Sequence, residues 1–462
     1  MTGYKAEEVV ERGLQAAGGR GCAVLVEETA QVNLRWALNG LTTNGLTRSS
    51  SVTVIVSAQV DGGTAVGVLT RQGIGPADVA DLVSDAAAQA DRAAPAEDAA
   101  PFADGEPAPG WDAPAGETDA ATLTAVAAGL GEVFGHAAAQ GRESFGFAQH
   151  EVTTTWLGTS GGVRLRHEQP NGTIELTGRA TVPNRSTWVG RTTRDFADVD
   201  VIALDDDIAT RLEWQRRRVD LPPGRYDTVL PPSSVADLMA FLFYYSDARS
   251  AHEGRTAFSR PGGGTRLGDR LSDVPLTLHS DPAHPGLESA ANVLTTASWP
   301  MASVFDNGLP ISPTSWLDAG VVAALPSTRH TARLTGLPFR PPAWNLVLDS
   351  PNGAGSELEL VTGLDRGLLL TCLWYIREVD PASMLLTGLT RDGVYLVEGG
   401  EIAGAVGNYR FNESPVDLLG RVDAVGAGGV TLARELGEYF PRTSMPALRV
   451  SGFNMSTSSQ AS

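Results

Sequence analysis

The chain has 462 residues and a formal net charge of −19, from 54 acidic and 35 basic residues. Nucleic-acid binding needs a basic surface that neutralises phosphates, so this charge balance argues against a nucleic-acid partner. An acidic surface also repels anionic membranes, and the most apolar segments, 235–245 and 367–376, are much shorter than the roughly 20 residues of a membrane-spanning helix. With 42% hydrophobic residues, the composition predicts a globular protein without a membrane partner.

The cysteine content and the N-terminal sequence both bear on location. Cys22 and Cys372 are the only two cysteines and lie far apart in the sequence, which gives no disulfide framework and fits a reducing compartment. Residues 1–11 are polar and acidic and lack the basic and apolar stretches of a signal peptide. We therefore expect a cytoplasmic protein.

The first part of the chain alternates between helical and strand patterns. Apolar residues at helical spacing predict a helix over residues 7–17, and a second helix follows Pro76. Between them, an apolar run at 22–27 and every-second-residue patterns at 32–38 and 52–56 predict strands. Residues 94–119 then contain five prolines and little apolar content, which predicts a linker or surface loop that does not pack.

The remaining segments complete an α+β fold with a large strand-rich C-terminal domain. Residues 123–134 predict a helix, and several short strands follow up to residue 182. Three aspartates at 205–207 and three arginines at 216–218 flank another helical stretch, as the helix dipole favours. The predicted divisions are a helix-plus-sheet segment 1–93, a linker 94–119, a second such segment 120–220, a β-rich domain 221–456 and a disordered tail 457–462.

Two histidine motifs resemble metal sites at first sight. His252-Glu253 is half of a zinc-peptidase motif, but no second histidine follows at helical spacing, so we interpret it as a solvated loop pair. His279, Asp281 and His284 lie within six residues, but neighbouring prolines preclude a regular helix. A surface turn is the simpler interpretation of these three residues.

Two glycine-rich motifs and one cysteine complete the search. Ser160 stands in a Gly-x-Ser-x-Gly pattern, but a strand pattern rather than a helix follows, which favours a hairpin turn over a nucleophile elbow. The glycine-rich stretch 261–268 matches neither phosphate-binding fingerprint and is interpreted as a flexible loop. Cys372 lies in a strongly apolar run, where a single cysteine is usually an inert core residue.

The pattern of the C-terminal half resembles the TldD/PmbA family, some members of which are labelled modulators of DNA gyrase. The resemblance rests on three stretches, GLLLTCLWY at 367–375, MLLTGLTRDGVYLVEGGEI at 384–402 and NYRFNES at 408–414. The order and spacing of these stretches agree with the third segment of that family. A more diffuse resemblance extends over most of the chain.

The resemblance implies a role in a pair of homologous subunits. The TldD type carries the zinc-binding motif His-Glu-x-x-x-His on the helix that opens the C-terminal domain, and the TldE/PmbA type lacks it. In this sequence Leu238 and Phe243 stand at the two histidine positions and Met239 at the glutamate position. We therefore expect no catalytic, metal-binding or cofactor-binding residue in this chain, and zinc in a TldD-like partner with which it degrades or matures unfolded or modified peptides.

Two alternatives to this heterodimeric metallopeptidase subunit remain open. One is a homodimeric peptide-binding or chaperone-like protein without protease activity. The other is a hydrolase with an unrecognised site, for which Ser160 or the pair His252 and Glu253 would be the candidates.

Overall fold

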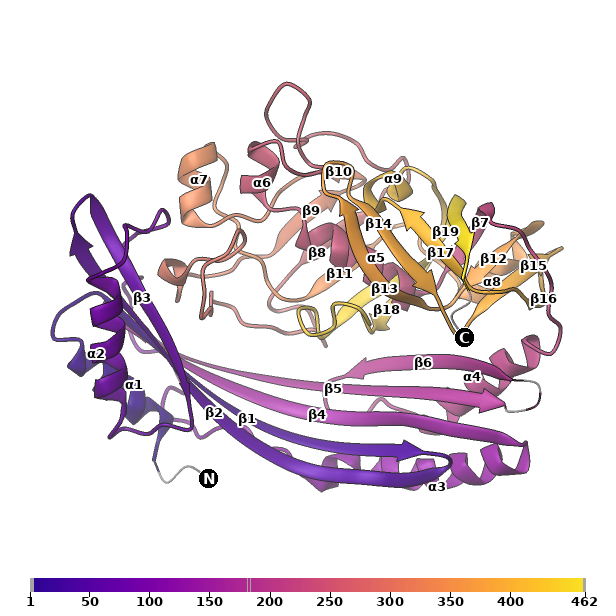
Figure 1. Cartoon of the computed structure of the whole chain (residues 1–462), viewed down its shortest axis with the longest axis horizontal. Coiled ribbons are helices and arrows are strands. Elements are labelled where there is room, and N and C mark those ends of the chain that lie inside the picture. The colour runs from indigo at the N-terminus through magenta and orange to yellow at the C-terminus, as the bar shows by residue number, and fades with distance from the viewer. Residues whose placement is uncertain (1–3, 181, 183, 460–462) are drawn as a thin grey trace.

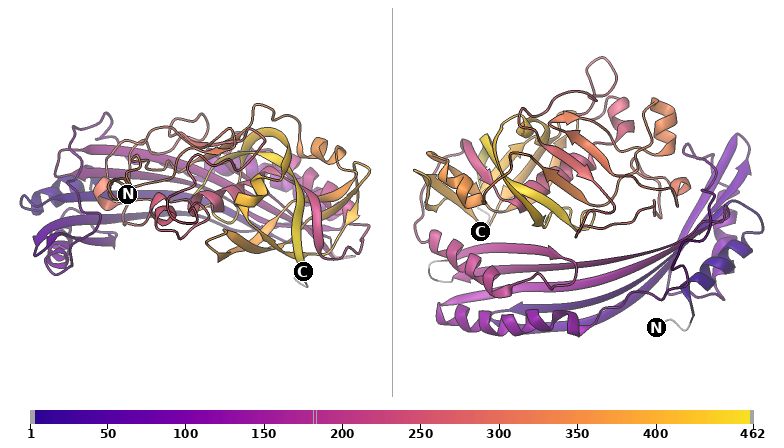
Figure 2. Two further views of the ribbon diagram at one scale, coloured as in Figure 1. Left: turned by 90° about the horizontal axis from the view of Figure 1, so that it is seen from above. Right: turned by 180° about the vertical axis from the view of Figure 1, so that it is seen from behind.

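The computed structural model describes residues 4–180, 182 and 184–459 of the chain. Figure 1 shows a long curved sheet, formed by the first half of the chain, and a strand-rich C-terminal unit that lies along one side of it. Figure 2 shows the same arrangement from above and from behind. The α+β class predicted from the sequence is confirmed.

Six antiparallel strands form the curved sheet in the order β3-β2-β1-β4-β5-β6. Their bounds are β1 Cys22–Ala37, β2 Gly40–Val60, β3 Gly63–Gln72, β4 Arg142–Thr159, β5 Arg164–Ala180 and β6 Arg185–Thr193. β1 and β4 pair from Ala23 with Thr159 to Trp36 with Gly146, so the segments before and after the proline-rich stretch share one sheet.

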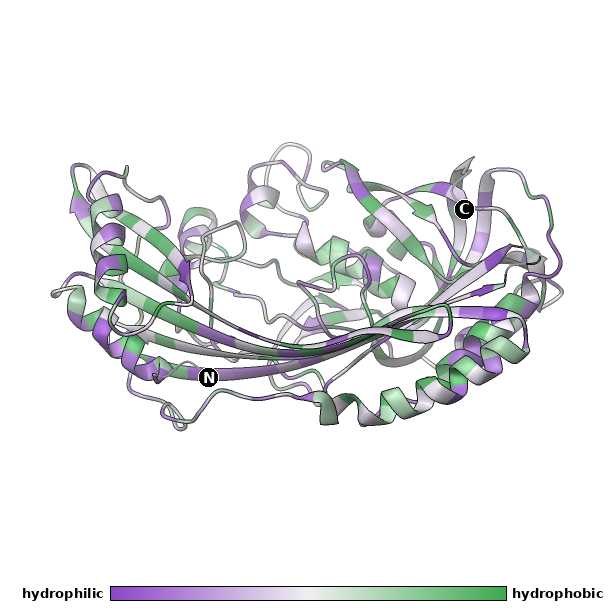
Figure 3. Cartoon of the chain, turned by 60° about the horizontal axis from the view of Figure 1, so that its bottom comes forward, coloured by the Kyte–Doolittle hydropathy of each residue, from purple (hydrophilic) through white to green (hydrophobic). Residues whose placement is uncertain are grey.

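Two pairs of helices cover the ends of one sheet face. α1 (Ala6–Ala16) and α2 (Val79–Ala90) pack over Val24 and Val26 of β1, whereas α3 (Thr124–Ala139) and α4 (Val201–Trp214) pack over Leu34 and Trp36. These β1 residues share one face because side chains alternate along a strand. Figure 3 shows a hydrophilic stretch in the middle of the sheet between these covered ends, where residues 27–31 of β1 pair with residues 47–51 of β2.

The strand breaks predicted within the sheet are wrong, because the predicted pieces join into strands much longer than average. Residues 22–27 and 32–38 belong largely to one strand, β1, whose polar middle keeps its backbone hydrogen bonds to β2 and β4. The apolar run at 22–27 also has a structural reason. Val24 and Val26 face the helices, while Ala23 and Leu25 pack on the opposite face against residues of another cluster.

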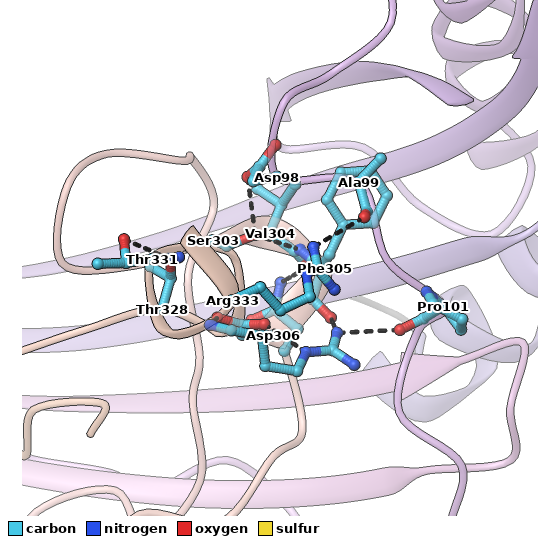
Figure 4. A network of polar contacts seen from close by, with 12 residues as sticks. Asp98, Ala99, Pro101, Ser303, Val304, Phe305, Asp306, Thr328, Thr331 and Arg333 are labelled. Carbon is cyan, nitrogen blue, oxygen red and sulfur yellow. Dashed lines mark hydrogen bonds and ion pairs between the residues drawn. The ribbon is translucent and has the colours of Figure 1, made fainter. Parts of the chain in front are cut away.

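The expectation that residues 94–119 do not pack is wrong at Phe102 and Ala103, which are buried. The ring of Phe102 stacks on that of Phe305 in the C-terminal unit, with ring centroids 5.5 Å apart. Ser303 Oγ donates a hydrogen bond to Asp98 (2.7 Å), and Arg333 donates one to the carbonyl oxygen of Ala99 (3.3 Å), as Figure 4 shows. The stretch therefore connects the curved sheet to the C-terminal unit through specific contacts.

The C-terminal unit is built on a 13-stranded sheet. Its strands are β7 Gly224–Leu230, β8 Thr277–Ser280, β9 Thr314–Asp318, β10 Val321–Val322, β11 Leu346–Asp349, β12 Arg366–Leu370, β13 Leu373–Asp380, β14 Leu385–Thr390, β15 Val394–Glu398, β16 Glu401–Ala405, β17 Tyr409–Glu413, β18 Val422–Thr431 and β19 Thr443–Ser458. Its helices are α5 Pro232–Tyr244, α6 Ala248–His252, α7 Arg329–Thr335, α8 Glu357–Thr362 and α9 Pro415–Leu419. Among the described residues, no helix combines the length and apolarity required to cross a membrane.

Two further expectations need correction. The tail was predicted to be disordered from residue 457, but Thr457 pairs with Arg410 and Ser458 with Tyr409 as the end of β19. The rest of that prediction, at 460–462, lies outside the described residues. The aspartates at 205–207 do not open a helix, because α4 already begins at Val201, where the side chain of Asp200 caps it.

Candidate functional site

α5 is the helix that opens the C-terminal unit, and it lies in the interior of that unit (Figure 1). Pro231 precedes the helix and Pro232 occupies its first turn, a position that tolerates a residue without a backbone N–H. Every residue from Ser234 to Phe243 is buried. A helix that is buried on all sides belongs to a core, and this one supports the sheet rather than a solvent-filled site.

The three positions singled out by the family resemblance lie in this core. Leu238, Met239 and Phe243 are each 0% exposed. The ring centroid of Phe243 lies 5.0 Å from that of Trp316 and 5.6 Å from that of Phe440. None of the three side chains offers an imidazole, carboxylate or thiolate, the groups that bind Zn²⁺, so these positions do not fit a zinc ion.

A cluster of aromatic side chains lies at the C-terminal end of α5. We call it the aromatic shelf, made of Tyr244, Tyr245, Trp299, Trp344 and Tyr439. Tyr244 is central, with ring centroids 5.3 Å from Tyr245, 5.7 Å from Trp299 and 5.2 Å from Tyr439. Trp299 stacks in turn on Trp344 at 5.7 Å.

The aromatic shelf is partly open to solvent. Tyr439 is 41% exposed, and the other four side chains are half-buried. Partial burial raises the pKa of Tyr244 and of Tyr245, so both phenols stay protonated at neutral pH and can donate hydrogen bonds. Rings with a polar tip at a partly wet surface suit the side chains and backbone of a peptide.

An ionisable side chain is buried on α5. Asp237 of α5 is 2% exposed, and its Oδ1 accepts a hydrogen bond from the backbone N–H of Glu435 (2.9 Å). Burial raises the pKa of Asp237 well above its usual 3.8, which favours the neutral acid. Its polar contact is to the backbone of the loop after β18, so its first effect is to fix that loop against α5.

The same loop carries Arg434, which connects the two units of the molecule. Its guanidinium carbon lies 4.5 Å from the ring centroid of Trp188 on β6 and 4.1 Å from that of Trp374 on β13. Its Nη1 lies 2.9 Å from Cys372 Sγ. Cys372 is buried, as expected, and burial raises the pKa of its thiol to about 12, so the neutral thiol prevails despite the nearby cation.

The two histidine motifs lie at different places in the C-terminal unit. His252 is not in a loop but is the last residue of the short helix α6, because Asp247 caps that helix by accepting a hydrogen bond from Ser250 N–H (2.8 Å). Glu253 is solvent-exposed and pairs with Arg249 (3.0 Å).

The second motif forms a strand end and a turn. His279 belongs to β8 and donates a hydrogen bond from Nε2 to Asp349 Oδ2 (3.0 Å), and its ring centroid is 5.8 Å from that of His284. The predicted turn follows it, since His284 N–H bonds to the carbonyl oxygen of Asp281 (3.0 Å). Within the described part of the chain, no three histidine, cysteine or acidic side chains are arranged to share a metal ion.

Ser160 lies in the hairpin turn between β4 and β5, as predicted. Its Oγ accepts a hydrogen bond from the backbone N–H of Cys22 (3.1 Å). Among the described residues, no histidine is hydrogen-bonded to Ser160. A serine nucleophile needs a base within hydrogen-bond reach, and the geometry here supplies a turn instead.

Sequence reasoning located α5 but missed the aromatic shelf and Arg434. Trp299, Trp344 and Tyr439 come from three separate loops with no common spacing, so no periodic pattern signals their contact. The one available signal was the Tyr244-Tyr245 pair, which ends an apolar helix with two amphipathic residues.

Comparison with known proteins places this geometry in context. A model of the PmbA/TldA metallopeptidase C-terminal domain matches residues 223–457, just over half of the chain. No curated protein gives a significant match.

Solved structures are similar over nearly the whole chain. TldE from Thermococcus kodakarensis is 15% identical, with a TM-score of 0.76 over 97% of this chain and 99% of that one. A candidate modulator of a DNA gyrase from Thermotoga maritima is 19% identical, with a TM-score of 0.74 and coverage of 97% and 99%. A similarly described protein from Bacteroides thetaiotaomicron is 14% identical, with a TM-score of 0.73 and coverage of 97% and 98%. At these identities the structural similarity concerns the fold.

Proposed function

The chain belongs to the TldD/PmbA metallopeptidase family, and on that premise we propose that it is the non-catalytic, TldE/PmbA-like subunit of a two-subunit zinc peptidase. One observation carries the proposal. The helix that would hold the zinc motif has Leu238, Met239 and Phe243 at the relevant positions, and all three are packed in the core. Neither zinc binding nor activation of a water molecule is open to such side chains.

In this proposal the catalytic groups come from a cytoplasmic TldD-like partner that carries His-Glu-x-x-x-His and the zinc ion. The substrate is an unfolded or modified peptide, bound as an additional strand along a sheet edge. A suitable edge is β13, which pairs only with β14 among the described strands and exposes Tyr375 (58%) and Val379 (57%). Main-chain hydrogen bonds along an edge give affinity without reading sequence, which suits a broad substrate range.

Co-expression tests the proposal directly. The chain is produced alone and together with a TldD-like chain, and hydrolysis of an unfolded peptide is measured with and without a chelator. Activity that appears only in the pair and disappears with the chelator is the expected result. A pair whose partner has both motif histidines replaced by alanine is the matched control. Chelator-sensitive activity in this chain alone, with no partner present, would refute the proposal.

A second candidate function is a homodimeric peptide-binding protein without protease activity. The aromatic shelf and the free edge of β13 favour it, because both are present in this chain without a partner. Calorimetric titration of the isolated chain with unfolded peptide, combined with its mass in solution, separates the two functions. Micromolar peptide binding by a self-dimer that does not associate with a TldD-like chain would select this second function. The hydrolase alternative has no comparable support at Ser160 or His252.

A further inference from the structure

A second region of the C-terminal unit has the features of a binding site and is distinct from α5. It is a cavity of about 550 Å³ bounded by β7, the loop before β8, the start of β14, the end of β17, α9 and β19. Four arginines line it, Arg225, Arg266, Arg270 and Arg421. The carboxylates in its lining are Glu413 and Asp417. The lining thus carries two more positive than negative charges, in a chain whose net charge is −19.

Two of the four arginines are neutralised by carboxylates. Arg421 contacts the buried carboxylate of Glu413 and donates from Nη1 to the carbonyl oxygens of Ser451 (2.7 Å) and Gly452 (3.0 Å). Arg266 pairs with Asp269 (3.2 Å). Glu413 also accepts a hydrogen bond from the backbone N–H of Asn454 (2.7 Å), so it has little capacity left for a second cation.

The other two arginines retain unneutralised charge. Arg270 donates to the carbonyl oxygens of Ser272 and Ala319, both at 3.0 Å, and has no ion pair among the described residues. Arg225 donates to the carbonyl oxygen of Gly452 (3.0 Å) and is 4.0 Å from Glu413. These bonds to carbonyl oxygens orient the guanidinium groups without cancelling their charge. Arginine held in this way suits phosphate oxygens, which accept its planar set of donors.

We propose that this cavity binds an anion of the phosphate class, either free hydrogen phosphate or a phosphate monoester. Arg225 and Arg270 neutralise its charged oxygens. The glycine-rich stretch 261–268 takes part through Arg266, although it matches no phosphate-binding fingerprint. The cations of side chains, rather than the backbone amides of a P-loop, supply the positive field here. This proposal is independent of the peptidase function.

Calorimetric titration with inorganic phosphate at constant ionic strength tests the site in the full chain. We expect saturable binding that Arg270→Gln and Arg225→Gln each weaken about ten-fold, because each variant loses a charge-assisted hydrogen bond to the anion. Arg366→Gln is the matched control, since Arg366 is an exposed arginine on β12 outside the cavity. Thermal unfolding of each variant checks that it is folded. Absence of saturable binding, or equal weakening by Arg366→Gln, would overturn the proposal.

A further titration identifies the ligand within this class. A phosphate monoester such as phosphoserine that binds more tightly than inorganic phosphate would assign the site to an esterified ligand, and equal or weaker affinity would assign it to the free anion.

Discussion

At the scale of single residues, the buried ion pair of Arg142 and Asp205 gives one aspartate of the acidic run 205–207 a structural role that the sequence does not reveal. Arg142 donates two parallel hydrogen bonds to Asp205, at 2.8 and 2.9 Å, and both side chains are almost fully buried. The sequence alone suggested that the aspartates at 205–207 complement a helix dipole. In the structure Asp205 is in the second turn of α4, facing β4, and its partner lies 63 residues earlier in the chain.

Removing one partner of this pair leaves a buried charge without compensation. We therefore expect Asp205→Ala to lower the free energy of unfolding by about 3–5 kcal/mol, as is usual for a broken buried ion pair. Urea denaturation measures the change, and Asp206→Ala, at an exposed position of the same helix, is the control. Replacing both partners by Met and Leu recovers much of the loss. Equal effects of the variants at 205 and 206 would contradict this account.

Asp237 makes stability depend on pH. Burial raises its pKa in the folded state, so between its unfolded pKa near 3.8 and its higher folded pKa the folded chain binds more protons than the unfolded chain. Stability from this group is therefore greatest at low pH and is lost as the pH rises through that window. Asp237→Asn keeps the acceptor for Glu435 N–H but cannot ionise.

As the pH rises from 4 to neutral, we expect the melting temperature of Asp237→Asn to fall less than that of the unmodified chain. Melting temperatures of both proteins across this range provide the measurement, and only their difference counts, because burial also raises the pKa of Glu413 and Asp306. Parallel pH profiles for the two proteins would show that Asp237 does not titrate in this window.

At the scale of elements, α5 is the clearest case in which sequence and structure agree. The family resemblance placed Leu238, Met239 and Phe243 on the helix that opens the C-terminal domain, and all three are buried on α5. The predicted hairpin at Ser160 is also confirmed, since glycines between two alternating stretches leave few other conformations. Local patterns were sufficient where neighbouring residues determine the structure.

Local sequence patterns did not predict the features that depend on contacts between residues far apart in the chain. β1 appeared as two strands because its polar middle, at Glu28 and Gln31, interrupts the apolar alternation, although its backbone is paired on both sides. The proline-rich stretch appeared unable to pack because Phe102 is nearly its only large apolar residue. That one ring has a partner, Phe305, about 200 residues later. The aromatic shelf could not be predicted either, because three of its five side chains come from three separate loops.

The packing of α5 supports a further prediction. Phe243 is fully buried between Trp316 and Phe440, so Phe243→Ala removes a ring and leaves a cavity between two aromatic side chains. We expect the free energy of unfolding to fall by about 3–5 kcal/mol. Chemical denaturation gives the value, with Leu358→Ala on the partly exposed face of α8 as the control. A loss below about 1 kcal/mol would indicate that Phe243 is not part of a tightly packed core.

At the scale of the whole molecule, two separate sets of contacts fix the C-terminal unit over the curved sheet. One set joins β6 to the C-terminal unit, where Arg434 stacks on Trp188 and Thr192 Oγ1 donates to the carbonyl oxygen of Pro441 (2.6 Å). The other joins the proline-rich stretch to residues 303–306 and to Arg329 (Figure 4). Because the two sets lie far apart along the sheet, together they restrict rotation of one unit against the other.

Arg329 is the residue on which the second set depends most. Its Nε donates to Asp306 Oδ1 (2.6 Å) and its Nη2 to the carbonyl oxygen of Pro101 (2.9 Å), so a single guanidinium joins the C-terminal unit to the proline-rich stretch. Asp306 is 2% exposed, and burial raises its pKa while Arg329 opposes that rise. Without Arg329 the carboxylate would be buried with no counter-charge, and the proline-rich stretch would lose its hydrogen bond at Pro101.

Arg329→Gln should therefore loosen residues 94–119 from the C-terminal unit. We expect limited proteolysis to cleave this stretch about ten-fold faster, in keeping with a loss of about 1–3 kcal/mol when a hydrogen-bonded charge loses its partner. Arg340→Gln, at an exposed arginine that donates to the neighbouring carbonyl oxygen of Phe339, is the control. Adding Asp306→Asn to Arg329→Gln should restore part of the protection, because the buried carboxylate is then removed as well. Cleavage of Arg329→Gln at the rate of the unmodified chain would mean that the remaining contacts, the stacked rings of Phe102 and Phe305 and the hydrogen bonds of Asp98 and Ala99, are sufficient to hold this stretch in place.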